Sequence, residues 1–496
     1  MSANVDNNKR IAKNTVFLYI RQLVIIVVSL YTSRVVINTL GIEDFGIYNI
    51  VGGIVVLFSF LNGAMSSATQ RFLNFELGKN NLDGVKRIFS ISMTSYILIA
   101  FIVIILAETI GLWFLNTQIN IPEDRIVAAN WVYQFSLLTF CANLIRVPYN
   151  ATIIAYERMN FYAYTSIVEA VLKLGVVFLL MKSEFDRLIF YAFLIFVVTL
   201  LVALYYRIYC GRNFETARYK VLWDKKLFGQ IMSFSGWSLF GSVANMGTQQ
   251  GISIVLNLFY GVTINAAVGV ANQVTNAIYN FISNFQTAFN PQIVKLYASD
   301  SKDDFLSLIF KASKLSYFLF IFISIPILIC TDFILEKWLV IVPEYASEFC
   351  RLIILFLLIE AIGGPLWMSV QATGKIATYQ IIMSVLIFLN LPISYIALKM
   401  GYSPSSVWVV RIIMNLIIYV FRIFYLKNKI QLLTLLYFKK VILRSIVVTL
   451  ISLPIPFTIY SHMDASWFGF SATCAASFLI SGLVIYYIGL NRTERN

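Results

Sequence analysis

Charged residues are rare inside the long apolar runs of this 496-residue sequence, so each one is a candidate for binding or proton chemistry. Glu169 and Lys173 are four residues apart in the run 160–181, an acid-first spacing that pairs two side chains on a helix. Such a pair either neutralises itself or exchanges one partner for an anionic ligand or a proton. Arg146, near the end of the preceding run, is a candidate competitor for Glu169.

Three further arginines interrupt apolar runs. Arg21 lies in the run 14–37, Arg34 follows it by thirteen residues, and Arg411 lies in the run 404–426. An unpaired arginine inside a membrane helix costs at least about 2.5–3.5 kcal/mol on insertion scales, so Arg21 is expected to face a cavity or a partner. The alternative is that Arg21 snorkels to the interface. Arg34 lies about 140° around the helix from Arg21, so the two cannot share a narrow stripe. Arg411 is either a binding residue or a packed ion.

Isolated carboxylates are candidates for binding a coupling cation or a proton. Glu108 lies late in the run 89–113, and Glu360 lies in the middle of the run 352–370. Ionisable groups within membrane segments mark ion and proton pathways. Glu169 is a third candidate, because Lys173 can release it.

Amide side chains interrupt two neighbouring runs, 229–259 and 263–289. Asn272, Asn276 and Asn280 are four residues apart and therefore lie on one helix face, and Asn245 and Gln249 have the same spacing. Amides facing lipid without partners would be costly. The favoured interpretation is a polar cavity, and the alternative is hydrogen bonding between helices.

The elements that must position these residues follow from composition. Of the residues, 59% are hydrophobic and 12% charged, and the mean hydropathy is +0.79. A soluble domain carries roughly 25% charged residues. Runs of about 20 apolar residues are long enough to cross a bilayer as helices, which satisfy their own backbone hydrogen bonds. The sequence therefore predicts an all-α polytopic membrane protein with about fourteen spans, at 14–37, 46–69, 89–113, 127–148, 160–181, 187–206, 229–259, 263–289, 314–335, 352–370, 377–398, 404–426, 441–460 and 467–489.

The distribution of positive charge predicts the orientation. With a cytoplasmic N-terminus, the inside segments hold 28 Lys and Arg residues and the outside loops hold six. This is the asymmetry expected of a correct topology, with both termini cytoplasmic. The net charge of +14 then reflects orientation and contact with anionic lipids rather than nucleic-acid binding.

An internal repeat predicts the domain organisation. Residues around Ala68–Tyr96 match residues around Ala288–Tyr317 at an offset of 220 to 221, and a second weak match relates Ala155–Tyr164 to Ala372–Tyr379. Six spans per repeat is an even number, so both halves enter the membrane from the same side. We expect a six-helix lobe over 1–226, a second over 227–430 and an extra two-helix hairpin with a tail over 431–496. Two such lobes are typical of an alternating-access transporter.

No residue set typical of an enzyme or a metal centre emerges from the sequence. The five cysteines are odd in number and form no Cys-x-x-Cys pair, so we interpret them as small core residues. His462, the only histidine, is interpreted as an interfacial residue in an outside loop. The sequence Gly-x-x-x-x-Gly-Lys-Ser/Thr is absent, which argues against ATP as the direct energy source. We expect no cofactor, no metal and no enzyme activity.

Several short motifs, loose individually but fixed in order and spacing, resemble those of Wzx-type polysaccharide flippases. These proteins belong to the multidrug/oligosaccharidyl-lipid/polysaccharide exporter superfamily, and the resemblance covers nearly the whole chain. The similarity is carried by Asn14, Arg34-Val-Val-Ile-Asn-Thr-Leu-Gly41, Phe45-Gly46-Ile-Tyr48, Gly63, Arg71, Pro291, Tyr297, Gln371-Ala-Thr-Gly-Lys375 and Asn390-Leu-Pro-Ile393.

The resemblance implies twelve plus two spans and export of an undecaprenyl-pyrophosphate-linked repeat unit for O-antigen, capsule or a related glycan. It places the protein in a bacterial cytoplasmic (inner) membrane. The implied partners are the lipid-linked oligosaccharide, membrane lipids, and the polysaccharide polymerase and glycosyltransferases of the same pathway. In this pattern Arg34 precedes a Leu-Gly turn, which favours a structural role over phosphate binding.

Three alternatives stay open at this point. A cation-coupled multidrug or metabolite antiporter of the same fold would have a more apolar cavity and one essential carboxylate. A peptidoglycan-precursor flippase would carry several arginines across its first two spans. A glycan polymerase or ligase would need large outside loops with catalytic residues, whereas the loops here are short.

Overall fold

The computed structural model of the chain describes residues 2–56, 59–117, 121–261, 263–339, 342–463 and 465–495. Some side chains within these ranges, including that of Arg34, lie outside the description. The described residues form α-helices joined by short 3-10 and π-helical turns and contain no strand. The predicted all-α class is therefore confirmed.

The chain forms two units, Met1–Leu239 and Phe240–Asn496, and the division between them falls inside helix α8. The predicted lobe boundary at 226/227 lies just after the first residues of this helix, and the predicted C-terminal hairpin lies within the second unit. The first unit and its exit helix comprise α1 (Ser2–Val56), α2 (Ser59–Gly78), α3 (Leu82–Leu106), η1 (Ala107–Gly111), α4 (Leu112–Thr117), η2 (Glu123–Arg125), α5 (Ile126–Ala155), α6 (Met159–Met181), α7 (Arg187–Asn213), η3 (Glu215–Ala217) and α8 (Lys225–Tyr260).

The second unit continues with α9 to α15 and ends with the hairpin segments α16 to α20. These are α9 (Thr263–Ala298), α10 (Lys302–Ile329), α11 (Thr331–Trp338), α12 (Ala346–Thr373), α13 (Ala377–Phe388), α14 (Asn390–Lys399), α15 (Ser406–Ile430), α16 (Thr434–Tyr437), η4 (Phe438–Ile442), α17 (Leu443–Ser452), α18 (Pro454–His462), α19 (Trp467–Val484), η5 (Ile485–Gly489) and α20 (Arg492–Arg495).

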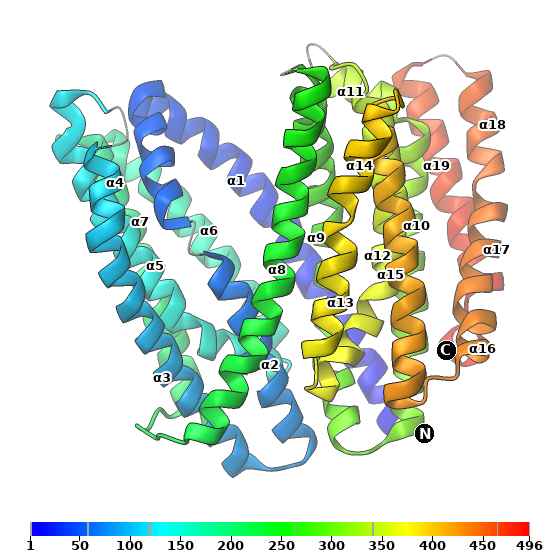
Figure 1. Cartoon of the computed structure of the whole chain (residues 1–496), viewed down its shortest axis with the longest axis horizontal. Helices are drawn as coiled ribbons and strands as arrows, with labels where there is room; N and C mark the ends of the chain where they lie inside the picture. The colour runs from blue at the N-terminus through cyan, green and yellow to red at the C-terminus, as the bar shows by residue number, and fades with distance from the viewer. Residues whose placement is uncertain are drawn as a thin grey trace. The chain divides into compact units, whose positions relative to one another are not determined.

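Ten helical segments of the described chain are long and apolar enough to cross a membrane. The predicted spans 14–37, 229–259 and 263–289 lie within the long helices α1, α8 and α9, whereas the predicted span 46–69 is divided between the end of α1 and the start of α2. Of these, α8 and α9 contain the amide residues singled out above, which lower their hydropathy. Figure 1 shows most of these helices running in similar directions within each unit. The chain is a multi-pass membrane protein.

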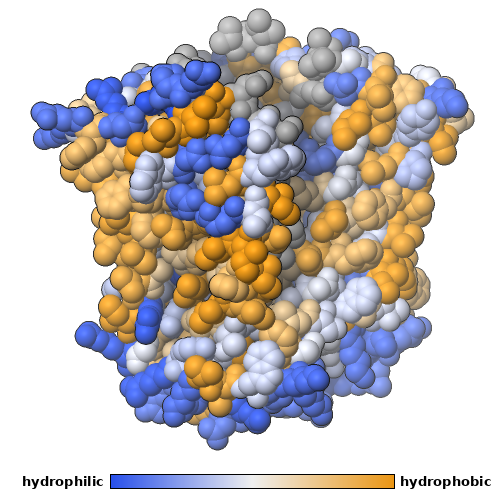
Figure 2. All heavy atoms as spheres, turned by 60° about the vertical axis from the view of Figure 1, so that its left-hand side comes forward, coloured by the Kyte–Doolittle hydropathy of each residue, from blue (hydrophilic) through white to orange (hydrophobic). Residues whose placement is uncertain are grey.

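The distribution of apolar side chains on the surface is typical of a protein in contact with lipid. On the face shown in Figure 2, apolar side chains cover most of the middle, and hydrophilic side chains gather at the two ends. Large apolar residues such as Phe101, Leu201 and Ile254 are more than half exposed. In water such exposure would be unfavourable, whereas hydrocarbon solvates it.

The backbone repeats itself in a way that supports the predicted internal repeat. The starts of α3 and α10, and likewise those of α5 and α12, are separated by the same offset as the matching sequence segments. Positive φ angles recur at the same places, in Asn80 (55°) and Asp300 (56°) at the turns before α3 and α10. Glu157 and Gly374 form a further pair of this kind, at the turns before α6 and α13.

Each unit has its own apolar core, in which α5 packs on α7 in the first and α12 packs on α9, α10 and α15 in the second. Cys210 belongs to the first core, and Cys330 and Cys350 to the second. These two cores hold the helices that carry the charged residues in place.

Candidate substrate site

The carboxylate of Glu169 is the centre of a charged cluster in the first unit. Arg146 of α5 donates a hydrogen bond to Oε2 of Glu169 on α6 at 2.7 Å, and Lys173 donates to Oε1 at 2.8 Å. The Glu169 side chain is 16% exposed, whereas that of Lys173 is 39% exposed. One carboxylate therefore holds two cations, and the more accessible cation is Lys173.

A cavity of about 330 Å³ opens beside this cluster, between α1 and α6. Its lining residues recur with helical spacing on both helices, so that two facing stripes enclose it. They are Ile25, Val28, Ser29 and Thr32 of α1, and Ser166, Glu169, Ala170 and Lys173 of α6.

Hydroxyl groups give this cavity hydrogen-bonding capacity beyond its charges. The hydroxyl of Thr32 donates to the carbonyl of Val28, and that of Ser166 donates to the carbonyl of Tyr162. These bonds use the hydroxyl protons, so both oxygens keep lone pairs that accept hydrogen bonds from a ligand. The cavity thus combines a cationic group with hydrogen-bond acceptors.

Arg21 lies on α1 one helical turn before Ile25 and stacks over the Tyr162 ring of α6, 4.6 Å from the centroid. Arg146 lies over the ring of Tyr206 on α7 at 5.5 Å. The charges of Arg21, Arg146 and Glu169 all act on Tyr206. The structure therefore brings Arg21 into the same cluster as Glu169, although the two are far apart in sequence. Arg34 is in the helical backbone of α1, but its side chain lies outside the described part of the structure.

In the second unit, Arg411 of α15 stacks on aromatic rings. Its guanidinium lies 4.4 Å from the Phe356 centroid and 5.2 Å from that of Trp408. Glu360 of α12 is half-buried, and its charge acts on Arg411 and on Arg422. Among the described residues, Glu360 forms no hydrogen bond or ion pair.

Sequence reasoning missed Arg422, which it counted among the charges of a cytoplasmic loop. The structure buries this residue at 9% exposure. Its Nε donates to the hydroxyl of Tyr379 at 2.6 Å and its Nη1 donates to the carbonyl of Gly363 at 2.8 Å. Arg71, also counted as a loop charge, is buried among the Phe72, Phe75 and Phe234 rings. Both residues were counted as cytoplasmic charges because they lie near the cytoplasmic ends of predicted spans, whereas the structure packs them against other helices.

Some of the predicted amide residues form hydrogen bonds within or between helices, and others are exposed as a polar cavity would require. Gln249 of α8 donates to Asn272 of α9 at 3.4 Å, and Asn245 donates to the carbonyl of Gly241. Asn276 and Asn280 are exposed. Amides on a membrane helix need polar surroundings, so this exposed stripe of α9 is expected to face water.

The remaining candidate, Glu108, lies apart from the charged cluster. It is exposed within the π-helical turn η1, and Gln134 of α5 donates to its Oε2 at 3.3 Å. It contributes nothing to the cavity lining.

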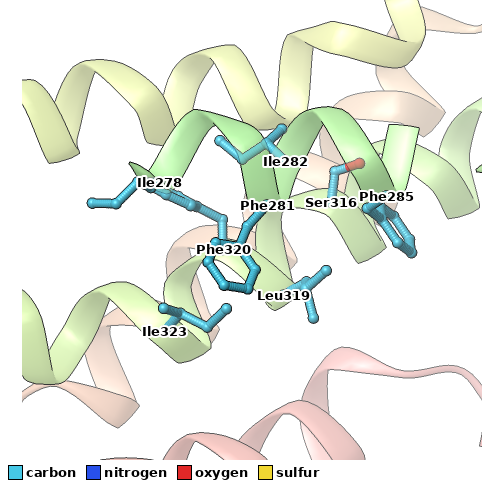
Figure 3. A pocket seen from close by; sticks show the side chains of 8 residues that line it. All are labelled: Ile278, Phe281, Ile282, Phe285, Ser316, Leu319, Phe320 and Ile323. Carbon is cyan, nitrogen blue, oxygen red and sulfur yellow. The ribbon is translucent and has the colours of Figure 1, made fainter. Parts of the chain in front are cut away.

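A second pocket, between α9 and α10, is too small for a substrate (Figure 3). Its volume is about 10 Å³, and Ser316 is the one polar residue among the apolar side chains that line it. A cavity of this size holds at most one water molecule. We interpret it as a packing gap.

Comparisons with solved structures define the fold class. The chain is similar to a MATE protein in complex with MaD3S (TM-score 0.73, 12% identity) and to an outward-facing multidrug resistance MATE family transporter of the MOP superfamily (0.72, 12%). It is also similar to a MOP superfamily transporter from Pyrococcus furiosus with a binding pocket of reverse polarity (0.70, 13%). Each likeness covers 86% of this chain and 96% of the other. The fold is that of MATE transporters.

Comparison with protein families then gives the family. Residues 11–297 match the family described as polysaccharide biosynthesis protein, and residues 238–396 match the MatE family. No curated protein matches the chain. Because the first match spans more than half of the sequence, the chain belongs to the polysaccharide biosynthesis protein family.

Proposed function

We propose that this protein is a flippase that moves undecaprenyl-pyrophosphate-linked oligosaccharide repeat units from the cytoplasmic to the outer leaflet of a bacterial inner membrane. Membership of the polysaccharide biosynthesis family and the MATE fold support transport of a glycan precursor. The observation that carries the proposal is the cavity between α1 and α6, where the accessible Lys173 lies beside a carboxylate that already holds a second cation.

The chemistry of this cavity suits a diphosphate. A diphosphate carries negative charge on several oxygens, and charge-assisted hydrogen bonds from Lys or Arg are the strong ones. Lys173 gives up its hydrogen bond to Glu169 and binds a phosphate oxygen, while Arg146 remains paired with the carboxylate of Glu169. Sugar hydroxyls then donate to the oxygens of Thr32 and Ser166. The cavity volume suits a diphosphate or a single sugar ring rather than a complete repeat unit.

The Glu169 carboxylate also makes release of the substrate feasible. Binding that is too tight would trap the lipid, so a transporter needs an internal competitor for its cation. When the substrate leaves, Glu169 reclaims Lys173 at 2.8 Å and restores the empty site. Transport by alternating access, with both termini cytoplasmic, requires no covalent step. The polymerase and glycosyltransferases of the pathway would consume and supply the lipid-linked unit.

A binding measurement tests the site. Purified protein is titrated with an undecaprenyl-pyrophosphate-linked oligosaccharide, and the apparent Tm is compared with that in undecaprenyl monophosphate and in tetraphenylphosphonium, an organic cation. We expect stabilisation mainly by the diphosphate lipid and tighter binding by Glu169→Gln, because its cations lose their competitor. Stabilisation by tetraphenylphosphonium alone would contradict the proposal.

The second candidate function, a cation-coupled antiporter, is favoured by one observation. The MatE match covers Glu360, and this carboxylate has no hydrogen-bonding or ion-pair partner among the described residues. In either function Glu360 is a candidate for binding the coupling proton or cation, with Arg411 and Arg422 as its charged neighbours on α15.

Substitution of Glu360 distinguishes the flippase from the antiporter. In the flippase, Glu360→Gln is expected to abolish acceleration by an imposed proton or sodium gradient, while downhill movement of the lipid continues. In the antiporter, the same substitution removes efflux of organic cations altogether. The measurement is transport in liposomes with and without the gradient, with Glu108→Gln as the control carboxylate.

A further inference from the structure

A buried ion pair in the second unit is separate from Arg411 and Glu360. Lys314 of α10 is 2% exposed, and its ammonium donates to Oε2 of Glu494 at 2.5 Å. The two side chains are 3% and 8% exposed. Sequence reasoning counted Lys314 among the charges of a cytoplasmic loop. Because removing a charge from water is costly without a matched partner, this position requires an anion.

Arg444 provides a second cation at this site. It is the second residue of α17, and its guanidinium donates to the side chain of Asn491 and to the carbonyl of Gly489. The charges of Arg444 and Lys311 both act on Lys314. Lys314 thus binds the carboxylate of Glu494 directly, and Arg444 binds Asn491, whose backbone N–H donates to the same carboxylate.

The anion comes from a small element. Glu494 belongs to the four-residue helix α20, which follows Leu490 in an extended conformation (φ −85°, ψ 139°). Its carboxylate also accepts the backbone N–H of Asn491 at 2.7 Å. In Figure 1 this end of the chain is marked close to α16.

The hairpin next to α20 is anchored more firmly. Gly489 packs so closely on α10 that a Cβ there would lie 2.7 Å from the Phe318 ring. Lys314 and Arg444 are thus fixed by packed helices, while their anion is supplied by a short segment after a break in the helix. Displacing α20 would leave Lys314 without its carboxylate, next to the guanidinium of Arg444.

We propose that Lys314 and Arg444 form a binding site for the phosphate of an anionic membrane lipid, and that Glu494 occupies this site as an internal substitute. Arg and Lys are the residues that bind phosphate most strongly. The site lies where α17 begins and η5 ends, at the end of the hairpin, and Lys314 is the first residue of the predicted span 314–335, where lipid headgroups are expected. Lys439 and Lys440 in the neighbouring turn η4 are exposed and attract anionic lipids.

The consequence is that the Glu494 carboxylate of α20 and the lipid phosphate compete for the same site. A bound lipid displaces Glu494, and the hairpin then carries a lipid at the end where α20 was attached. This inference does not depend on the proposed flippase function, because neither Lys314 nor Arg444 lines the cavity of the first unit.

The test measures the thermal stability of the purified full chain with added phosphatidylglycerol, phosphatidylcholine or inorganic phosphate. In Glu494→Gln, the carboxylate no longer competes, so phosphatidylglycerol should raise the apparent Tm by about 2–4 °C or more above the rise in the wild type. Phosphatidylcholine should give no such difference. The double variant Lys314→Met/Glu494→Gln should lose the response, because the buried cation is gone.

Arg495→Ala is the matched control, because it removes an α20 contact to the carbonyl of Tyr487 but keeps the ion pair. It should respond as the wild type does. An equal response to phosphatidylglycerol in all variants would overturn the proposal, as would no gain in Glu494→Gln. An equal shift with inorganic phosphate would overturn the assignment of the ligand to a lipid. If Glu494→Gln fails to fold, lipid retained by the wild type and by Arg444→Gln is compared by native mass spectrometry, and equal retention of phosphatidylglycerol would also overturn it.

Discussion

Gly41 and Gly261 both have a backbone conformation that favours glycine, with φ angles of 83° and 73°, and their separation in sequence equals the offset of the internal repeat. Gly41 breaks α1, and Gly261 lies between α8 and α9. The two residues therefore mark the same corner in each half of the internal repeat, where a chain of L-residues would be strained.

Alanine at Gly41 should destabilise the protein by strain alone. Its φ and ψ of 83° and 166° lie in a region that is essentially restricted to glycine, at a cost of about 1–3 kcal/mol for other residues. Among the described residues, no atom lies within 4 Å of a Cβ at this position, so the expected effect comes from the backbone conformation. We expect a lower apparent Tm for Gly41→Ala and an unchanged or higher one for the helical control Gly52→Ala. Equal Tm values for the two variants would contradict this conformation.

A charged network at one end of the first unit should make its stability depend on pH. Arg125 donates from Nε to Asp44 at 2.8 Å and from Nη1 to Asp186 at 2.6 Å. Partial burial raises the pKa of Asp186, but hydrogen bonds from the Ile189 N–H and from Arg125 outweigh it and hold the pKa below its usual range. Asp186 therefore stabilises the fold above its unfolded pKa of about 3.9, and this contribution is lost as the pH falls through the lowered folded value.

The measurement is the apparent Tm from pH 7 down to pH 3. The wild type should lose stability below about pH 4, and Arg125→Gln should start from a lower Tm and show a smaller acid-dependent loss. Arg187→Gln is the control, since Arg187 donates to the carbonyl of Thr39 at 3.2 Å instead of to a carboxylate. An identical acid profile for Arg125→Gln and the wild type would exclude this role of the network.

Removal of Arg422 should destabilise the protein, because buried hydrogen bonds are lost. Arg422→Met leaves the Tyr379 hydroxyl and the Gly363 carbonyl without their donor, at a cost of about 1–3 kcal/mol for each buried group left unsatisfied. The expected result is a clearly lower apparent Tm. Lys427→Met, on an exposed position of the same helix, should have little effect. A tolerated Arg422→Met would mean that water or lipid replaces the guanidinium.

The predictable part of the structure was set by local patterns. Apolar runs and the repeat spacing can be read directly from the sequence, so most helices appear close to the predicted positions. The exception is the predicted span 46–69, which is divided between α1 and α2. The spacing of Glu169 and Lys173 indicated a pair on one helix face for the same reason.

Contacts between distant segments could not be predicted in this way. Lys314 and Glu494 are 180 residues apart, and nothing local in the sequence distinguishes a buried lysine from a solvated one. Arg422 was likewise counted as a cytoplasmic charge because it lies near the end of the predicted span 404–426, where the sequence alone does not show which helices cover a cation. The split among amides, with Asn272 bonded to Gln249 and Asn276 exposed, depends on which face of α9 packs inward.

The most direct test of the central claim is movement of a fluorescent undecaprenyl-pyrophosphate-linked oligosaccharide between the leaflets of liposomes that contain the purified protein. Lys173→Met removes the accessible cation of the cavity and should slow this movement by roughly 10-fold or more, the equivalent of one charge-assisted hydrogen bond. The control variant Lys182→Met, changed just beyond the end of α6, should move the lipid at the wild-type rate. Two results would contradict the account: movement of the lipid by Lys173→Met at the wild-type rate, or no movement of this lipid by the wild-type protein.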